Sequence, residues 1–142
     1  MKFHWYPEVK IDVSNGSLVF DSGTIGPHLD RPAFLETSLG HKSKVVLVNQ
    51  GWVNVHFEPE AGVSATAFFK DNHLRKVFFA FSVPTDNIKE WVEDREQQRK
   101  ETHDVWLRTE LGNPPYEFQW GNVESDFDPR AWSSEILVTY SE

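Results

Sequence analysis

The stretch VVLVNQGWVNVHFE, residues 45 to 58, decides the fold. Val53, Val55 and Phe57 alternate with polar residues, which is typical of a strand with one buried face and one wet face. An aliphatic run precedes them, and the Asn-Gln-Gly sequence between the two favours a reversal of the chain. Residues 63 to 83 repeat this arrangement around a polar Lys-Asp-Asn-His break. The two regions together predict two hairpins, hence four antiparallel strands.

The amino-terminal part of the chain predicts a hairpin followed by a short helix. The pair Asn15-Gly16 tolerates the positive φ angles of a tight turn, so we expect two short strands within residues 10 to 20. Asp30 can accept hydrogen bonds at the start of a helix. This helix is expected over about residues 31 to 39, with Gly40 as its stop.

Past the middle of the chain, the apolar residues are spaced as on one face of a helix. Their spacing predicts one long helix over about residues 87 to 111, which Gly112 ends. Residues 93 to 104 contain no strongly apolar side chain, so the helix is expected to face water there and to pack at its two ends. Trp91 and Trp106 are expected to pin those ends to the sheet.

The carboxy-terminal third returns to strands, expected over residues 116 to 124 and 135 to 140 and joined by a loop over residues 125 to 134. The whole pattern predicts an α+β fold for a single domain over residues 1 to 142, with a mainly antiparallel sheet of about six to eight strands and the two helices. The core is expected to contain Trp52, Val53, Val55, Phe57, Phe68, Val77, Phe79, Phe81, Trp91, Trp106, Phe118, Ile136 and Val138.

Charge is distributed unevenly along the chain. The formal net charge is -8, and the last 33 residues hold seven carboxylates against a single arginine, a local charge of -6. A surface of one sign attracts oppositely charged partners and repels nucleic acid and anionic membranes. We therefore expect a basic protein partner, and no binding to nucleic acid or to membranes.

The acidic last 33 residues also contain a candidate partner-binding site. Glu124, Asp126 and Asp128 follow one another at spacings of two, which puts their carboxylates on one side of an extended segment. Nearby aromatic residues can act as anchors, because interfaces draw most of their energy from a few such residues. A plainer alternative is that these charges protect an exposed sheet edge from aggregation. The candidate residues are Glu117, Trp120, Glu124, Asp126, Phe127, Asp128 and Trp132.

No motif indicates catalysis or metal binding. The six histidines are scattered singly, and the acidic segment lacks the spacing and the glycine of a calcium loop. His103 and Asp104 are expected to form an ordinary surface pair on the long helix. No catalytic residue, metal ligand or cofactor is therefore assigned. The absence of cysteine fits a reducing compartment, and no segment has the length and apolarity of a signal peptide or membrane span, so a cytoplasmic location is expected.

Two stretches carry a family resemblance. The first is DRPAFLETSLG at residues 30 to 40, and the second is HDVWLRTELGNPPY at residues 103 to 116, continuing through Trp120-Gly121 to Asp128-Pro129. They resemble a group of small bacterial cytosolic proteins with a helix ending in Leu-Gly, a Pro-Pro-Tyr turn and a Trp-Gly step. The resemblance covers roughly half of the chain and implies a bacterial origin. Several small acidic bacterial proteins are immunity proteins, which neutralise toxins delivered between bacteria.

Three functions follow as hypotheses. The first is a non-enzymatic binding protein, a bacterial immunity protein that occludes a basic toxin domain with its acidic carboxy-terminal surface. The alternative is a small-molecule-binding protein or hydrolase with a pocket between helix and sheet lined by Trp and Phe, in which Asp126 or Asp128 acts as acid or base. The third is a structural subunit of a larger assembly.

Overall fold

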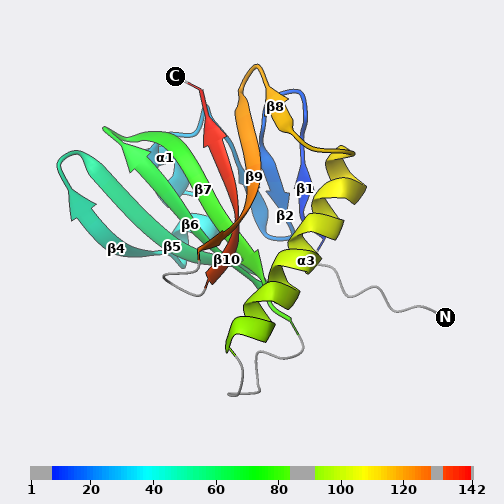
Figure 1. Cartoon of the computed structure of the whole chain (residues 1–142). Helices are drawn as coiled ribbons and strands as arrows, with labels where there is room; N and C mark the ends of the chain where they lie inside the picture. The colour runs from blue at the N-terminus through cyan, green and yellow to red at the C-terminus, as the bar shows by residue number, and fades with distance from the viewer. Residues whose placement is uncertain (1–7, 84–91, 129–132, 142) are drawn as a thin grey trace.

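The computed structural model describes residues 8 to 83, 92 to 128 and 133 to 141, and within them it contains two antiparallel sheets and three helices (Figure 1). The α+β class and the mainly antiparallel sheet are confirmed. The small sheet consists of β1 (Lys10–Ile11), β2 (Leu18–Phe20) and β3 (Gly23–Ile25). The large sheet consists of β4 (Lys44–Asn49), β5 (Trp52–Glu60), β6 (Val63–Lys70), β7 (His73–Phe81), β8 (Tyr116–Phe118), β9 (Gly121–Asp128) and β10 (Ser133–Tyr140). The helices are α1 (Arg31–Leu35), α2 (Ser38–His41) and α3 (Val92–Leu111).

The predicted amino-terminal hairpin is confirmed, since β1 pairs antiparallel with β2. Gly16 lies in its turn with a φ of +80°, a left-handed conformation that glycine adopts without a steric penalty. Its N–H donates to the carbonyl of Asp12 at 2.7 Å. A third strand, β3, pairs with β2 and completes the small sheet, although no strand was expected there.

The predicted short helix is divided into two. Asp30 caps α1 as expected, because its side chain accepts a hydrogen bond from the N–H of Ala33 at 2.8 Å. The helix then breaks at Thr37, whose hydroxyl donates to the carbonyl of Phe34 and accepts from the N–H of Gly40. Thr37 therefore ends one helix and caps the next, and Gly40 lies inside α2 instead of stopping it.

The large sheet has the strand order β4-β5-β6-β7-β10-β9-β8. The two predicted hairpins, β4-β5 and β6-β7, are confirmed. The carboxy-terminal expectation was wrong in detail: the segment expected as one strand over residues 116 to 124 is two strands with a turn at Gln119 and Trp120, and β9 continues to Asp128. The acidic residues expected in a loop therefore lie on a strand in the described structure.

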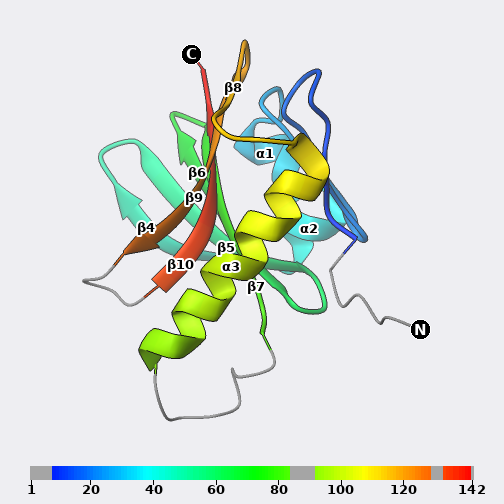
Figure 2. The same ribbon diagram turned by 45° about the vertical axis from the view of Figure 1, so that its right-hand side comes forward.

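The helices and the small sheet pack on one side of the large sheet, its inner face (Figures 1 and 2). Phe20 from β2 and Phe34 from α1 contact inner phenylalanines of the large sheet edge to face, and so does Trp106 from α3. The buried residues confirm most of the expected core: Val55, Phe57, Val77, Phe79, Phe81, Trp106, Ile136 and Val138. Trp52, Val53, Phe68 and Phe118 are only partly buried, and Trp91 lies outside the described residues.

Helix α3 is not water-facing through its middle, contrary to expectation. His103 is fully buried and Glu96 is 6% exposed, because α3 lies against β7, β9 and β10 along its length. The described part of the helix starts at Val92, so the predicted start at residue 87 lies outside the described residues. None of the helices in the described part of the chain is long and apolar enough to cross a membrane.

Candidate functional site

The face of the large sheet that points away from the helices, its outer face, carries the side chains that alternate with the core residues. Three of the candidate residues, Glu124, Asp126 and Asp128, occupy every second position of β9 and therefore lie together on this face. Glu124 and Asp126 are exposed, and Asp128 is half-buried. Strand alternation has thus brought the three carboxylates to one side, as the spacing predicted.

A fourth carboxylate joins this group from the neighbouring strand. Glu135 of β10 is directly opposite Asp126 in the register of β9 and β10. Its partial burial raises the pKa of the Glu135 carboxyl above its usual value, and repulsion from Asp126, Glu96 and Asp128 raises the pKa further. Burial and the neighbouring carboxylates together therefore disfavour the ionised form of Glu135.

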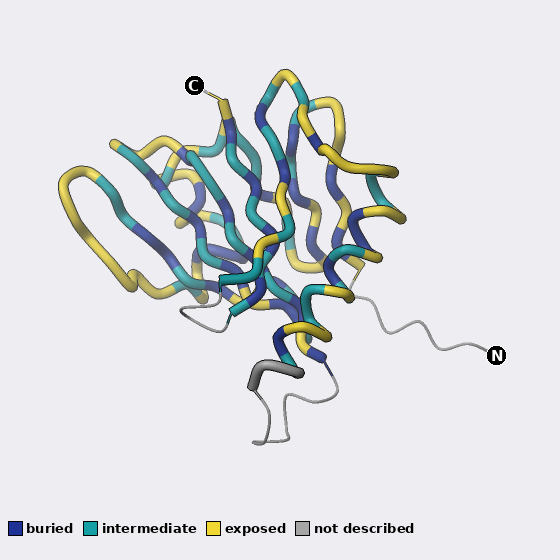
Figure 3. Tube along the Cα trace, in the orientation of Figure 1, coloured by how far each residue is buried: buried dark blue, intermediate teal, exposed yellow. Residues whose placement is uncertain are grey.

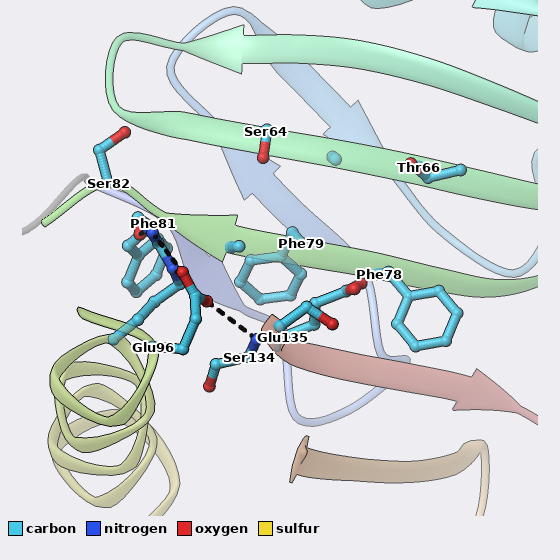
Figure 4. Close-up of a pocket in the computed structure, with 13 residues that line it drawn as sticks. Ser64, Thr66, Phe78, Phe79, Phe81, Ser82, Glu96, Ser134 and Glu135 are labelled. Carbon is cyan, nitrogen blue, oxygen red and sulfur yellow. Dashed lines mark hydrogen bonds and ion pairs between the residues drawn. The ribbon is translucent and has the colours of Figure 1, made fainter. Parts of the chain in front are cut away.

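A hollow of about 410 Å³ opens beside Glu135, where β7 and β10 separate (Figure 4). Two side chains of α3 reach into the gap between the strands. Glu96 accepts a hydrogen bond from the backbone N–H of Ser134 at 3.1 Å, and Arg99 donates to the carbonyl of Phe81. The two side chains also pair with each other, with Arg99 Nε 2.9 Å from Glu96 Oε1.

The Glu96 carboxylate stays ionised in this setting. Burial alone would raise the pKa of Glu96, but hydrogen bonds and charge from Arg99, together with the Ser134 N–H and Arg95, outweigh it and lower the pKa below its ordinary value. The carboxylate thus works as a structural acceptor that holds the start of β10.

His103 is a second buried polar group of α3 and not the surface residue that the sequence suggested. Its Nε2 accepts a hydrogen bond from the backbone N–H of Phe81 at 3.1 Å, so Nδ1 carries the proton of the neutral ring. Burial and the neighbouring Arg99 lower the pKa of His103 to about 3. Within the described structure Nδ1 has no hydrogen-bond partner. The ring is neutral and fully enclosed, which suits packing better than proton transfer to a substrate.

The other half of the outer face is aromatic and carries two cations. The Lys70 and Lys76 ammonium groups lie 5.5 and 5.8 Å from the centre of the Trp52 ring. Phe68, which also faces outward, contacts Phe78 at 5.1 Å between ring centres. This part of the outer face therefore carries aromatic rings with two lysines, whereas Glu124, Asp126, Asp128 and Glu135 lie over β9 and β10.

Not every candidate residue joins the carboxylates. Trp120 is half-buried: its ring stacks on Phe118 at 4.8 Å and its Nε1 donates to the carbonyl of Val13 at 2.8 Å, so it ties the first hairpin to β8. Phe127 belongs to the alternate positions of β9 that face inward. Glu117 is exposed on β8, opposite Asn122. Trp132 lies outside the described residues.

Metal and ligand sites receive no support from the geometry. The described residues contain no group of three His, Cys, Asp or Glu side chains that could hold a metal ion. A second hollow of about 380 Å³ separates α3 from β8 and β9. Its lining combines Lys100, Arg108 and Asp104 with Tyr116 and the prolines before β8, so it offers opposed charges rather than the aromatic walls expected for a small-molecule pocket.

No protein-family model matches this sequence, and no curated protein matches it either. A solved structure matches a large part of the chain. It is "Rhs1-CT in complex with cognate immunity protein RhsI1", with a TM-score of 0.58 and 14% sequence identity over 93% of this chain and 86% of that chain.

The two chains share a fold. At 14% identity the likeness concerns the arrangement of the elements alone, so the site has to be derived from the residues of this chain. Sequence reasoning found the carboxylates of β9 but missed Glu135 and Glu96. The alternation of polar and apolar residues in the last strand was a signal for Glu135, whereas the burial of Glu96 depends on a strand separation that no local pattern shows.

Proposed function

We propose that this protein is a bacterial immunity protein, which neutralises a basic toxin domain by binding and occluding it without catalysis. The observation that carries the proposal is the group of Glu124, Asp126, Asp128 and Glu135 on one face of β9 and β10. The shared fold with a chain of the Rhs1-CT and RhsI1 complex supports it independently. We propose the cytoplasm as its compartment, where such a toxin would act.

The electrostatics of the four carboxylates favour a cationic partner over an internal structural role. Like charges directly opposite one another destabilise a sheet, and this repulsion adds to the effect of burial in raising the pKa of Glu135. Lysine and arginine side chains of a partner would remove this repulsion on binding. Complementary charge would also accelerate association and select the partner.

We place the centre of the proposed binding surface at Asp126 and Glu135, with Glu124 and Asp128 beside them and Glu117 at its margin. We keep Trp120, at the turn between β8 and β9, and Phe127, on the inner side of β9, in the proposal as candidate aromatic anchors. Trp132 remains part of the proposal on the basis of its sequence position.

The test is neutralisation of the toxin domain encoded next to this protein's gene. Cells that express the toxin domain should grow when the wild-type protein is co-expressed. A triple charge reversal, Glu124→Lys, Asp126→Lys and Glu135→Lys, should abolish the protection and weaken the purified complex. A matched reversal at exposed sites elsewhere, Asp21→Lys, Glu36→Lys and Glu101→Lys, changes the net charge equally and should retain protection.

Three outcomes separate the parts of the proposal. Loss of protection in both triple variants would show that net charge, and not this face, determines binding. Protection by both would show that the charges of this face are not needed for binding. A wild-type protein that neither binds the toxin domain nor restores growth would contradict the immunity function itself.

A further inference from the structure

The hollow between β7 and β10 is lined by an aromatic ring as well as by a carboxylate. Phe78 lines it from β7, and Glu135 lines it from β10 (Figure 4). Phe78 is directly opposite Leu137, which lies two residues beyond Glu135 on the same face of β10. Long side chains reach such diagonal neighbours across a pair of strands. One side chain of a partner can therefore contact the ring and the carboxylate together.

We propose that this hollow receives one arginine side chain of the toxin domain, whose guanidinium pairs with the Glu135 carboxylate and stacks on the Phe78 ring. This inference rests on the proposed immunity function, and it names the partner residue that anchors the complex. The carboxylates of β9 surround the anchor and attract the basic domain towards it.

The hollow exists because small side chains meet where the strands separate. Ser64 of β6 pairs with Ala80 of β7, and Ala80 would be the next residue opposite Glu135 if the pairing continued past Phe79 and Ile136. Buried and half-buried residues alternate along β10 and the second half of β7, and the half-buried ones form the outer face (Figure 3). Its volume of about 410 Å³ equals roughly fourteen water molecules at about 30 Å³ each, so a whole arginine side chain fits.

The charges of the hollow favour a cation. Its charged lining residues are Glu135, Glu96 and Arg99. Glu96 and Arg99 pair with each other, so their charges offset, whereas the described structure gives the Glu135 carboxylate no hydrogen bond or ion pair. Burial and the neighbouring carboxylates raise the pKa of Glu135, and a cation beside it would favour the ionised form again. An anion would meet an uncompensated negative charge.

The lining suits arginine better than lysine. A guanidinium is planar, binds a carboxylate through two parallel N–H groups and stacks on aromatic rings, whereas an ammonium is a compact, strongly hydrated charge. Phe68 contacts the Phe78 ring edge to face, with the ring centres 5.1 Å apart, which fixes the wall on which the guanidinium stacks. The hydroxyl oxygens of Ser64 and Thr66 line the hollow and can accept hydrogen bonds from the remaining N–H groups.

The first test closes the hollow without changing any charge. Ala80→Met places a long uncharged side chain in it and should weaken the complex with the toxin domain by about 30-fold or more, the loss that is usual for a residue that dominates an interface. Ala80→Ser leaves the hollow open and is the matched control, which should bind like the wild type. Isothermal titration calorimetry measures the affinities, and melting temperatures show whether each variant is folded.

The second test identifies the arginine through double-mutant cycles. Each arginine of the toxin domain is replaced in turn by lysine and titrated against the wild-type protein. One replacement should weaken binding by about 3- to 30-fold, the range for a lost contact between a cation and a ring. Its effect should vanish against Phe78→Leu, in which the ring is already absent. A purely structural effect of Phe78→Leu would weaken binding equally for every toxin variant.

The outcomes separate this inference from the immunity function on which it rests. A wild-type complex that Ala80→Met leaves intact would overturn the arginine anchor alone, and so would a complex in which no toxin arginine couples to Phe78. If Ala80→Met does not fold, the double-mutant cycles still decide. A wild-type protein that neither binds the toxin domain nor restores growth would overturn both proposals.

Discussion

Glu96 and Arg99, one turn apart on α3, together fill the gap that opens between β7 and β10. The paired register of these strands ends at Phe79 and Ile136, and beyond it Arg99 bonds the carbonyl of Phe81 while Glu96 bonds the N–H of Ser134. A helix thus supplies the hydrogen bonds that the adjacent strand would otherwise provide.

Arg99→Met should lower the free energy of unfolding by about 2 kcal/mol, the usual value for a lost hydrogen bond to a charged group, because it leaves the Phe81 carbonyl and the Glu96 carboxylate without this partner. Lys100→Met is the control on the same turn. Its ion pair with Asp104 is more than one-third exposed, so its loss should cost under about 1 kcal/mol. Urea denaturation measures both values, and equal losses would contradict a structural role for Arg99.

His103 should make the protein less stable as the pH falls below about 6.5. Its pKa is about 3 in the folded protein against 6.5 for a free histidine, so the unfolded chain takes up the proton first. The stability it contributes is complete above pH 6.5 and is lost towards pH 3, about 2 kcal/mol of it by about pH 5, at about 1.36 kcal/mol per pH unit.

Urea denaturation between about pH 7.5 and about pH 5 detects this loss. His103→Gln keeps an acceptor for the Phe81 N–H and should flatten the dependence. Glu96, whose pKa is lowered by folding, has the same sign but acts below the ordinary value of 4.5. Glu135, whose pKa is raised by folding, acts above 4.5 with the opposite sign, so the contribution of the histidine is the difference between the wild type and His103→Gln. An unchanged slope in His103→Gln would show that another group causes the loss.

Glu135→Gln should stabilise the protein while weakening the proposed complex. The folded state raises the pKa of Glu135, so its ionised form opposes folding at neutral pH, and removal of the charge should add about 0.2 to 1 kcal/mol. The stabilisation should disappear in acid, where Glu135 is protonated in both states. Glu101→Gln, exposed on α3, is the control and should change neither quantity. Thermal unfolding measures the stability of each variant, and binding titrations with the toxin domain measure its affinity.

Gly16→Ala should destabilise the first hairpin. A Cβ at this position would overlap the Trp120 ring, in addition to the strain of a φ of +80°. Gly112 has a nearly identical φ of +83° with nothing within 4 Å of the added atom, so Gly112→Ala measures the backbone strain alone. The difference between the two variants should be about 1 to 3 kcal/mol, the usual cost of overpacking. A similar loss in both would mean that the tryptophan moves aside freely.

The sequence predicted those features that depend on local period. Val53, Val55 and Phe57 indicated the antiparallel sheet, and the spacing of Glu124, Asp126 and Asp128 indicated their common side. The buried phenylalanine of β6 was assigned wrongly, to Phe68 in place of Phe69, because two adjacent phenylalanines compete for one inward position and only the strand pairing decides.

The features that were not predicted depend on contacts between segments far apart in the sequence. Glu96 and His103 are polar residues in a helix segment without strongly apolar neighbours, and such a segment ordinarily faces water. They are buried because the ends of β7 and β10 need hydrogen-bond partners. Their hydrogen-bond partners lie 22 residues away for His103 and 38 residues away for Glu96, beyond the reach of any local pattern.

The strand order has a consequence for synthesis. β10, the last of the described strands in chain order, lies between β7 and β9, so the large sheet cannot close until residues 133 to 140 have been synthesised. Until then the apolar edge of β7 is unpaired, and its pairing with β10 joins residues far apart in the chain, which slows folding. Loss of β10 would therefore remove the middle of the sheet and leave its two halves unjoined.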